Sequence, residues 1–171
     1  VGDGIFFWTP SWSYNDFKGG NMKTAGVTTI INNAGSISCY SNGTQNGSAI
    51  STSLGSYTGG ATLSVNNGVT TWNGYAGEII IYNSVLTTAQ RQLVEGSLAW
   101  KWGLQRYLQT TNPFYYQPAL PNVVLSKQLG NPFVETTNYV FTPTQFRNCV
   151  LWLDAADQTS ITLSGSNVSQ W

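Results

Sequence analysis

The sequence predicts an all-β fold that is rich in turns and carries one short helix. Three observations support this class. Of the 171 residues, only 8% are charged and 13% are aromatic, and the apolar runs are short. Asn-Gly pairs begin at Asn42, Asn46, Asn67 and Asn73, and both residue types tolerate the positive φ that two-residue hairpin turns require. Only one segment shows sustained helical spacing, so strands joined by turns account for most of the chain.

Several short segments are predicted to be strands because β-branched and aromatic residues are frequent in them. In order, they are Gly4–Trp8, Val27–Asn32, Ser36–Ser41, Ala61–Val65 and Gly77–Asn83. The last contains three consecutive isoleucines, which cannot all face water. We therefore expect this strand to lie centrally in its sheet, covered on both faces.

The segment "TTAQRQLVEGSLAWKWG" predicts the helix. Thr87 is a suitable N-cap and Gln90 follows three residues later, as in a capping box. Gly103 is placed to end the helix in a left-handed turn, and Gly96 costs about 1 kcal/mol relative to Ala, which predicts close approach of another element there. The face expected to be buried contains Leu93, Val94, Ser97, Leu98, Trp100 and Leu104.

Residues Gln109 to Asn138 differ in character from the rest. Four of the six prolines of the chain lie here, at Pro113, Pro118, Pro121 and Pro132. Proline disfavours both helix and regular strand pairing. We expect an aromatic, Pro-rich linker that lies on a neighbouring surface, followed from Tyr139 by a new pattern of strands.

Charge and composition exclude several classes of protein. Seven basic residues balance seven acidic ones, so the basic stripe of a nucleic-acid-binding protein is missing, and no apolar run is long enough to span a membrane. Histidine is absent, which removes the usual proton shuttle and the commonest metal ligand. Cys39 and Cys149 are expected to be small buried hydrophobes, although a disulfide between them stays open.

Three segments together resemble a known family. They are "GYAGEIIIYNSVLTTAQRQLVEGSLAWKWGL" (residues 74–104), "CYSNGTQNGS" (39–48) and "LWLDAADQTSITLSGSNVSQW" (151–171). The first is similar to the closing strand and helix of a laminin-G-like, concanavalin A-like jelly-roll domain, with Ser97 at a position where that family usually has Tyr. The last is similar to the beginning of such a domain.

The resemblance implies a concanavalin A-like jelly-roll sandwich with one short C-terminal helix. Residues 1–108 would be the C-terminal part of one domain, 109–138 the linker, and 139–171 the first strands of a second, similar domain. The chain would then be a window on a longer tandem-repeat protein. The resemblance also implies that Trp100 and Trp102 belong to the core.

Acidic residues offer two candidates for chemistry. The β-glucanase relatives of this fold carry carboxylates at alternate positions of one strand, but the positions two and four after Glu78 are Ile80 and Tyr82. We expect Glu78 to be a buried hydrogen-bond acceptor and the protein to have no catalytic residues. Asp154 and Asp157 could form a calcium pair or cap a turn. We favour the cap, and expect no cofactor apart from the open possibility of calcium.

Glycan contacts are a further possibility, because sugar sites use loop aromatics with polar neighbours. Trp72, Asn73 and Tyr75 form one such group, and Trp12 belongs to another. Packing on the sandwich is the favoured alternative for these aromatics. Glycosylation sequons begin at Asn42, Asn46 and Asn167, and they matter only if the protein enters the secretory pathway.

These features favour a structural function, because the family resemblance points to virion proteins of giant DNA viruses and to phage and bacterial surface proteins. We expect a non-enzymatic minor capsid, spike or surface protein located in the virion. Its partners would be other capsid proteins and, in addition, a cell-surface glycan. The alternative is a carbohydrate-binding module of a secreted or surface adhesin, located outside the cell. A glucanase-like enzyme is the third hypothesis.

Overall fold

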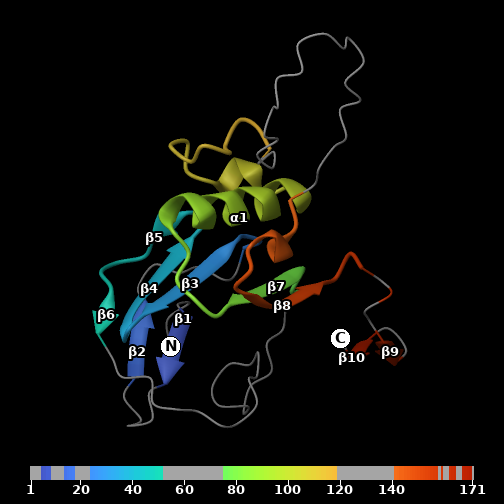
Figure 1. Ribbon diagram of the computed structural model, residues 1–171, viewed down its shortest axis with the longest axis horizontal. Helices are drawn as coiled ribbons and strands as arrows, with labels where there is room; N and C mark the ends of the chain where they lie inside the picture. Colours follow the sequence, from blue (N-terminus) through green and yellow to red (C-terminus); the bar gives the residue numbers. More distant parts are fainter. Residues whose placement is uncertain are drawn as a thin grey trace.

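The computed structural model describes residues 5–8, 14–17, 24–51, 75–118, 141–157, 159, 162–164 and 167–170. These residues form antiparallel strands and one α-helix, which lies against one side of the central strands (Figure 1), and this confirms the prediction of a β-rich fold with one helix in the part of the chain that is described. Two short hairpins lie near the ends of the chain. One pairs β1 (Ile5–Trp8) with β2 (Tyr14–Phe17), and the other pairs β9 (Thr162–Ser164) with β10 (Asn167–Gln170). The predicted strand 61–65 lies outside the described residues.

The largest sheet follows from two tight turns. β3 (Thr28–Asn33) and β4 (Ser36–Ser41) pair in register around a turn at Ala34 and Gly35, whose φ values are 50° and 89°. The predicted turn at Asn42-Gly43 also has positive φ at both residues, and it leads into β5 (Thr44–Gln45). β5 pairs with the end of β4, and β6 (Ile50–Ser51) pairs with the beginning of β4, at Ser36 and Ile37. The Asn-Gly signal therefore predicts this hairpin correctly.

The two faces of this sheet have different surroundings. Ile37 and Cys39 are buried on one face and pack with Ile50, whereas Thr29 and Tyr40 contact the helix from the other. Both cysteines are free thiols, and desolvation raises the pKa of the Cys39 thiol, an effect that a hydrogen bond from the Asn46 side chain opposes.

Cys149 is only half-buried. The prediction of two buried cysteines is therefore right for Cys39 and wrong for Cys149. The difference follows from their strands, because Cys39 lies in the middle of a strand that is paired on both sides. Cys149 begins a strand that pairs along one edge among the described residues, and its register is irregular at this point.

A second sheet joins segments that are far apart in the sequence. β7 (Glu78–Tyr82) pairs with β8 (Cys149–Asp154), so that Glu78 lies opposite Asp154 and Ile80 opposite Trp152. The prediction that β7 is covered on both faces is wrong, because Ile81 is 44% exposed. Among the described residues β7 pairs only with β8, and alternate side chains point away from the side that meets the helix.

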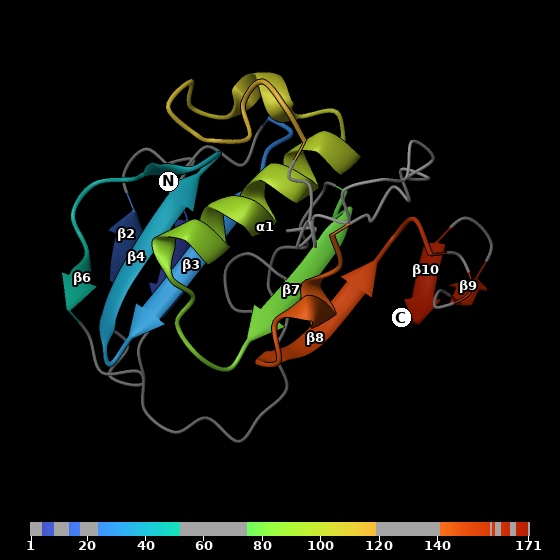
Figure 2. The same ribbon diagram turned by 45° about the horizontal axis from the view of Figure 1, so that its top comes forward.

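The helix α1 (Thr88–Lys101) begins and ends as the sequence predicts. Thr87 caps it and forms a full capping box with Gln90. Gly103 has a φ of 69° and follows the last turn. Figure 2 shows α1 lying across both the β3–β4 hairpin and the β7–β8 pair. Within the described part of the chain, no helix is long and apolar enough to cross a membrane.

The buried face of α1 differs from the predicted one. Of the six residues expected there, only Val94 is buried, and the other five are half-buried. The buried residues are Arg91, Val94, Glu95, Gly96 and Ala99. The helix is covered on two sides. The β3–β4 hairpin covers one side, and the residues that follow α1 cover the other. A single apolar stripe therefore does not describe its contacts.

The chain after the helix folds back onto it. It begins with the 3-10 helix η1 (Gln105–Tyr107), and Leu108 packs with Val27 and Ala99. Trp100 donates its indole N–H to the Phe114 carbonyl at 2.7 Å. The described start of the predicted linker thus contacts α1 through Phe114 and Tyr115, while the linker and its boundaries at residues 109 and 138 stay a prediction.

Gly96 is the point of closest approach between these elements. A Cβ atom added there would lie 2.5 Å from the Phe114 Cβ. We predict that Gly96→Ala lowers the free energy of unfolding by about 1–3 kcal/mol through overpacking, although alanine favours a helix by about 1 kcal/mol. Urea denaturation checks this, with Ser97→Ala on the same helix as the control. A stabilised Gly96→Ala variant would contradict the contact.

Candidate functional site

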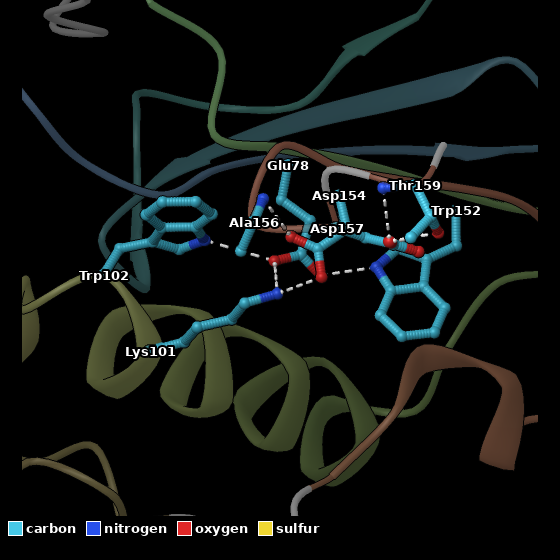
Figure 3. Close-up of polar contacts among 8 residues, drawn as sticks. All are labelled: Glu78, Lys101, Trp102, Trp152, Asp154, Ala156, Asp157 and Thr159. Carbon is cyan, nitrogen blue, oxygen red and sulfur yellow. Dashed lines mark hydrogen bonds and ion pairs between the residues drawn. The ribbon is translucent and has the colours of Figure 1, made fainter. Parts of the chain in front are cut away.

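A dense cluster of polar contacts lies where the end of α1 meets β7 and β8. It contains Glu78, Lys101, Trp102, Trp152 and Asp154 (Figure 3). Glu78 begins β7 and Asp154 ends β8, and the two residues are direct partners in the sheet. Their side chains therefore project from the same face, toward the last turn of the helix.

Lys101 joins the two acidic residues. Its Nζ atom lies 2.8 Å from Glu78 Oε2 and 2.5 Å from Asp154 Oδ2. The ammonium also lies in the last turn of α1, where the helix dipole favours a cation. The Lys101 side chain is 31% exposed and the Glu78 side chain 4%, so the cation is partly open to solvent whereas the Glu78 carboxylate is nearly enclosed.

Two indole groups complete the environment of the Glu78 carboxylate. Trp102 donates its Nε1–H to Oε2 at 3.1 Å, and Trp152 donates its Nε1–H to Oε1 at 2.6 Å. One carboxylate thus accepts hydrogen bonds from α1, from the residue that caps it and from β8. The prediction that Glu78 is a buried hydrogen-bond acceptor is confirmed.

Gly77 makes room for this arrangement. A Cβ atom at this residue would lie 3.0 Å from the Trp102 ring. The Gly77 carbonyl also accepts a hydrogen bond from the Ala155 amide at 2.8 Å. Glycine therefore lets the indole of Trp102 lie flat against the start of β7 and reach Glu78.

The pKa of Lys101 reflects opposing effects. Burial alone would lower it, but the hydrogen bonds to Asp154 and Glu78 and the charges of both carboxylates together raise the pKa above its ordinary value of 10.5. The charged form of the ammonium is therefore favoured by the fold. Tyr82, further along β7, also has a raised pKa, mainly because burial disfavours the phenolate.

The pairing of Glu78 with Asp154 is a carboxylate pair that sequence reasoning missed, since it considered partners only within one strand. Because both oxygens contact Lys101 Nζ, they lie at most about 5 Å apart, an upper limit that does not exclude the spacing of a retaining glycosidase pair. Here, however, the ammonium lies between them and two indoles hold Glu78. The geometry supports a structural junction rather than an open acid–base pair.

Asp154 and Asp157 both cap turns, as predicted. Asp154 Oδ1 accepts the Ala156 amide at 3.0 Å, and Asp157 Oδ1 accepts the Thr159 amide at 3.0 Å and its hydroxyl at 2.6 Å. These bonds from Thr159 hold the pKa of Asp157 below its usual range. Across the residues that the structure describes, no three acidic, cysteine or histidine residues gather to hold a metal.

A second buried ion pair connects α1 to the other sheet. Arg91 Nη1 lies 2.8 and 2.7 Å from the two oxygens of Glu95, whose side chain is 1% exposed. Thr29 donates its hydroxyl to Glu95 at 2.8 Å, and the Arg91 guanidinium lies 4.0 Å from the Tyr40 ring centre. The i, i+4 spacing of Arg91 and Glu95 was the one signal in the sequence for this pair.

The glycan candidates are not brought together among the described residues. Tyr75, just before β7, is 101% exposed, whereas Trp12, Trp72 and Asn73 lie outside the described part of the chain. Tyr75 presents an open aromatic ring, but nothing in its described surroundings forms a sugar-binding pocket with it.

The sequons differ in accessibility. Asn46 is buried, and its amide nitrogen, where a glycan would attach, donates to Ser41 Oγ at 2.7 Å. Asn42 lies in the hairpin turn and accepts the Val27 amide at 2.8 Å. Asn167 begins β10, of which only the backbone is described. A glycan on Asn46 would require this part of the turn to open.

Comparison of the chain with protein families, with curated proteins and with solved structures found no match in any of the three. The resemblance of residues 74–104 to the jelly-roll family therefore depends on the residues themselves.

The contacts of Lys101 with Glu78 and Asp154 predict how the free energy of unfolding depends on pH. A pKa that is raised in the folded state adds stability at pH values below the ordinary 10.5, and this stability is lost as the pH rises through the folded value. We predict that wild type is more stable than Lys101→Met near neutral pH and that the difference shrinks above about pH 10.5.

The measurement is the free energy of unfolding of both proteins between about pH 8 and about pH 12. Both chains retain Tyr82, so ionisation of that phenol cancels in the difference. A difference that stays constant over the whole range would show that Lys101 is not held by the two carboxylates.

Proposed function

We propose that this chain is part of a non-enzymatic structural protein of a virus particle, a minor capsid, spike or surface protein of a large DNA virus. It would be built from tandem concanavalin-like jelly-roll domains and act by packing against neighbouring capsid proteins. A cell-surface glycan could be a further partner.

The observation that carries this proposal is the β7–β8 pairing. β8 follows residues 119–140, a stretch of 22 residues, and it pairs with β7. Adding a separate strand to an open sheet edge is a common way for proteins to join. The low charge of the chain also suits surfaces that are buried in an assembly.

The structural role of the charged residues supports the same conclusion. Glu78 and Glu95 each accept hydrogen bonds from a basic residue and from neutral donors on other elements. Both acids are thus used to fasten α1 to a sheet. The resemblance of residues 74–104 to the closing part of jelly-roll domains in virion proteins supplies the link to a virus particle.

The test is mass spectrometry of purified virus particles, combined with immunogold labelling by antibodies raised against the chain. We expect the protein in the particles at a constant ratio to the capsid proteins. Its presence only in the soluble fraction of infected cells would contradict the proposal. A different result would support the enzyme hypothesis: the chain hydrolyses a β-glucan, and the substitution Glu78→Gln abolishes this hydrolysis.

A carbohydrate-binding module is the second candidate, favoured by the full exposure of Tyr75. Binding on a glycan array that is lost in Tyr75→Ala would support it. Tyr116→Ala is the matched control, because Tyr116 is also highly exposed, at 80%, on a different segment. Equal binding by wild type and Tyr75→Ala would remove this residue from any sugar site.

A further inference from the structure

We propose that residues 141–157, here called the docking segment, can bind β7 of a second copy of this chain as well as their own. This inference rests on the proposed function, because the second copy would be one of the partners against which the chain packs.

The docking segment is fastened to one short stretch of chain. Besides the β7–β8 ladder, its hydrogen bonds reach Gly77 through Ala155, and Asn83 and Ser84 through Asn148. The ion pair of Asp154 ends on Lys101. These partners are contiguous on the surface of residues 77–84 and the end of α1, so any copy that presents this surface offers the full set of contacts.

Aromatic packing adds to this interface. The 3-10 helix η2 (Pro143–Gln145) lies beside β7, and Tyr82 donates its hydroxyl to the Pro143 carbonyl at 3.4 Å. The Phe146 ring centre lies 6.0 Å from that of Tyr82 and 5.6 Å from that of Phe141. The segment thus carries its own small apolar group, which accompanies β8 wherever the strand docks.

β7 depends on this segment. Without it, the Glu78 carboxylate loses the indole hydrogen bond of Trp152, and hydrogen bonds to an ionised group are stronger than those between neutral groups. Lys101 also loses Asp154. An unoccupied β7 would therefore favour binding of the same segment from another copy.

The connection does not dictate which copy is used. The 22 residues 119–140 can extend to about 70 Å, well beyond the roughly 40 Å diameter of a domain of this size. Pairing within one chain is favoured in dilute solution, and pairing between chains becomes favoured when the protein concentration exceeds the effective concentration of the tethered segment. Exchange of a strand between copies is a low-cost route to association.

The experiment uses single cysteines in the chain of residues 1–171, with Cys39 and Cys149 replaced by alanine. One chain carries Ile81→Cys and the other Leu151→Cys, two exposed residues that are direct partners in the β7–β8 register. Partners across an antiparallel pair lie within the range of a disulfide. The two chains are refolded together at concentrations from about 1 µM to about 1 mM and oxidised.

We expect a disulfide-linked pair of unlike chains whose yield rises with concentration to about tenfold above the control. The control mixes the Leu151→Cys chain with an Ile30→Cys chain, whose cysteine is equally exposed but lies on β3. A third sample carries Ile81→Cys and Leu151→Cys in one chain and reports pairing within the chain.

Mixed chains that stay at the control yield at every concentration would overturn the inference, whether or not the third sample forms its internal disulfide. Such a result would leave the proposed function standing, because the presence of the protein in virus particles is measured independently. Conversely, exchange between copies together with absence from particles would reject the virion role and keep the exchange.

Discussion

The Glu78 carboxylate is the constraint on which the described structure depends most. It lies at the start of β7 with 4% of its side chain exposed and accepts hydrogen bonds from Lys101, Trp102 and Trp152. A charge in so little contact with water is tolerated only when it is paired and hydrogen-bonded. The single carboxylate therefore fixes the end of the helix, the first strand of the pair and the returning strand relative to one another.

Glu95 has the same role where α1 meets the β3–β4 hairpin, with Arg91 and Thr29 as its partners. The helix is thus fastened to two sheets by two buried carboxylates, while apolar contacts at Ala99 and Leu108 fill the space around it. Breaking a buried ion pair by removing one partner typically costs about 3–5 kcal/mol. In a chain with so few charged residues, this use of acids favours an architectural function.

Local signals were sufficient for much of the fold. The Thr87 capping box, the left-handed turn at Gly103 and the Asn42-Gly43 hairpin are set by neighbouring residues, and the sequence predicted all three. The pairing of Glu78 with Asp154 joins residues that are far apart in the sequence, and no local pattern encodes it. Likewise, the buried face of α1 was mispredicted because Arg91 and Glu95 become buried only through the sheet that they contact.

A double-mutant cycle between Glu78→Ala and Trp152→Phe tests the central claim most directly, because each substitution removes one partner of a hydrogen bond that joins two strands far apart in the sequence. A hydrogen bond between them at 2.6 Å predicts a coupling free energy of unfolding of about 1–3 kcal/mol. Strictly additive effects of the two substitutions would show that Glu78 does not hold β8, and the docking of residues 141–157 would lose its main support.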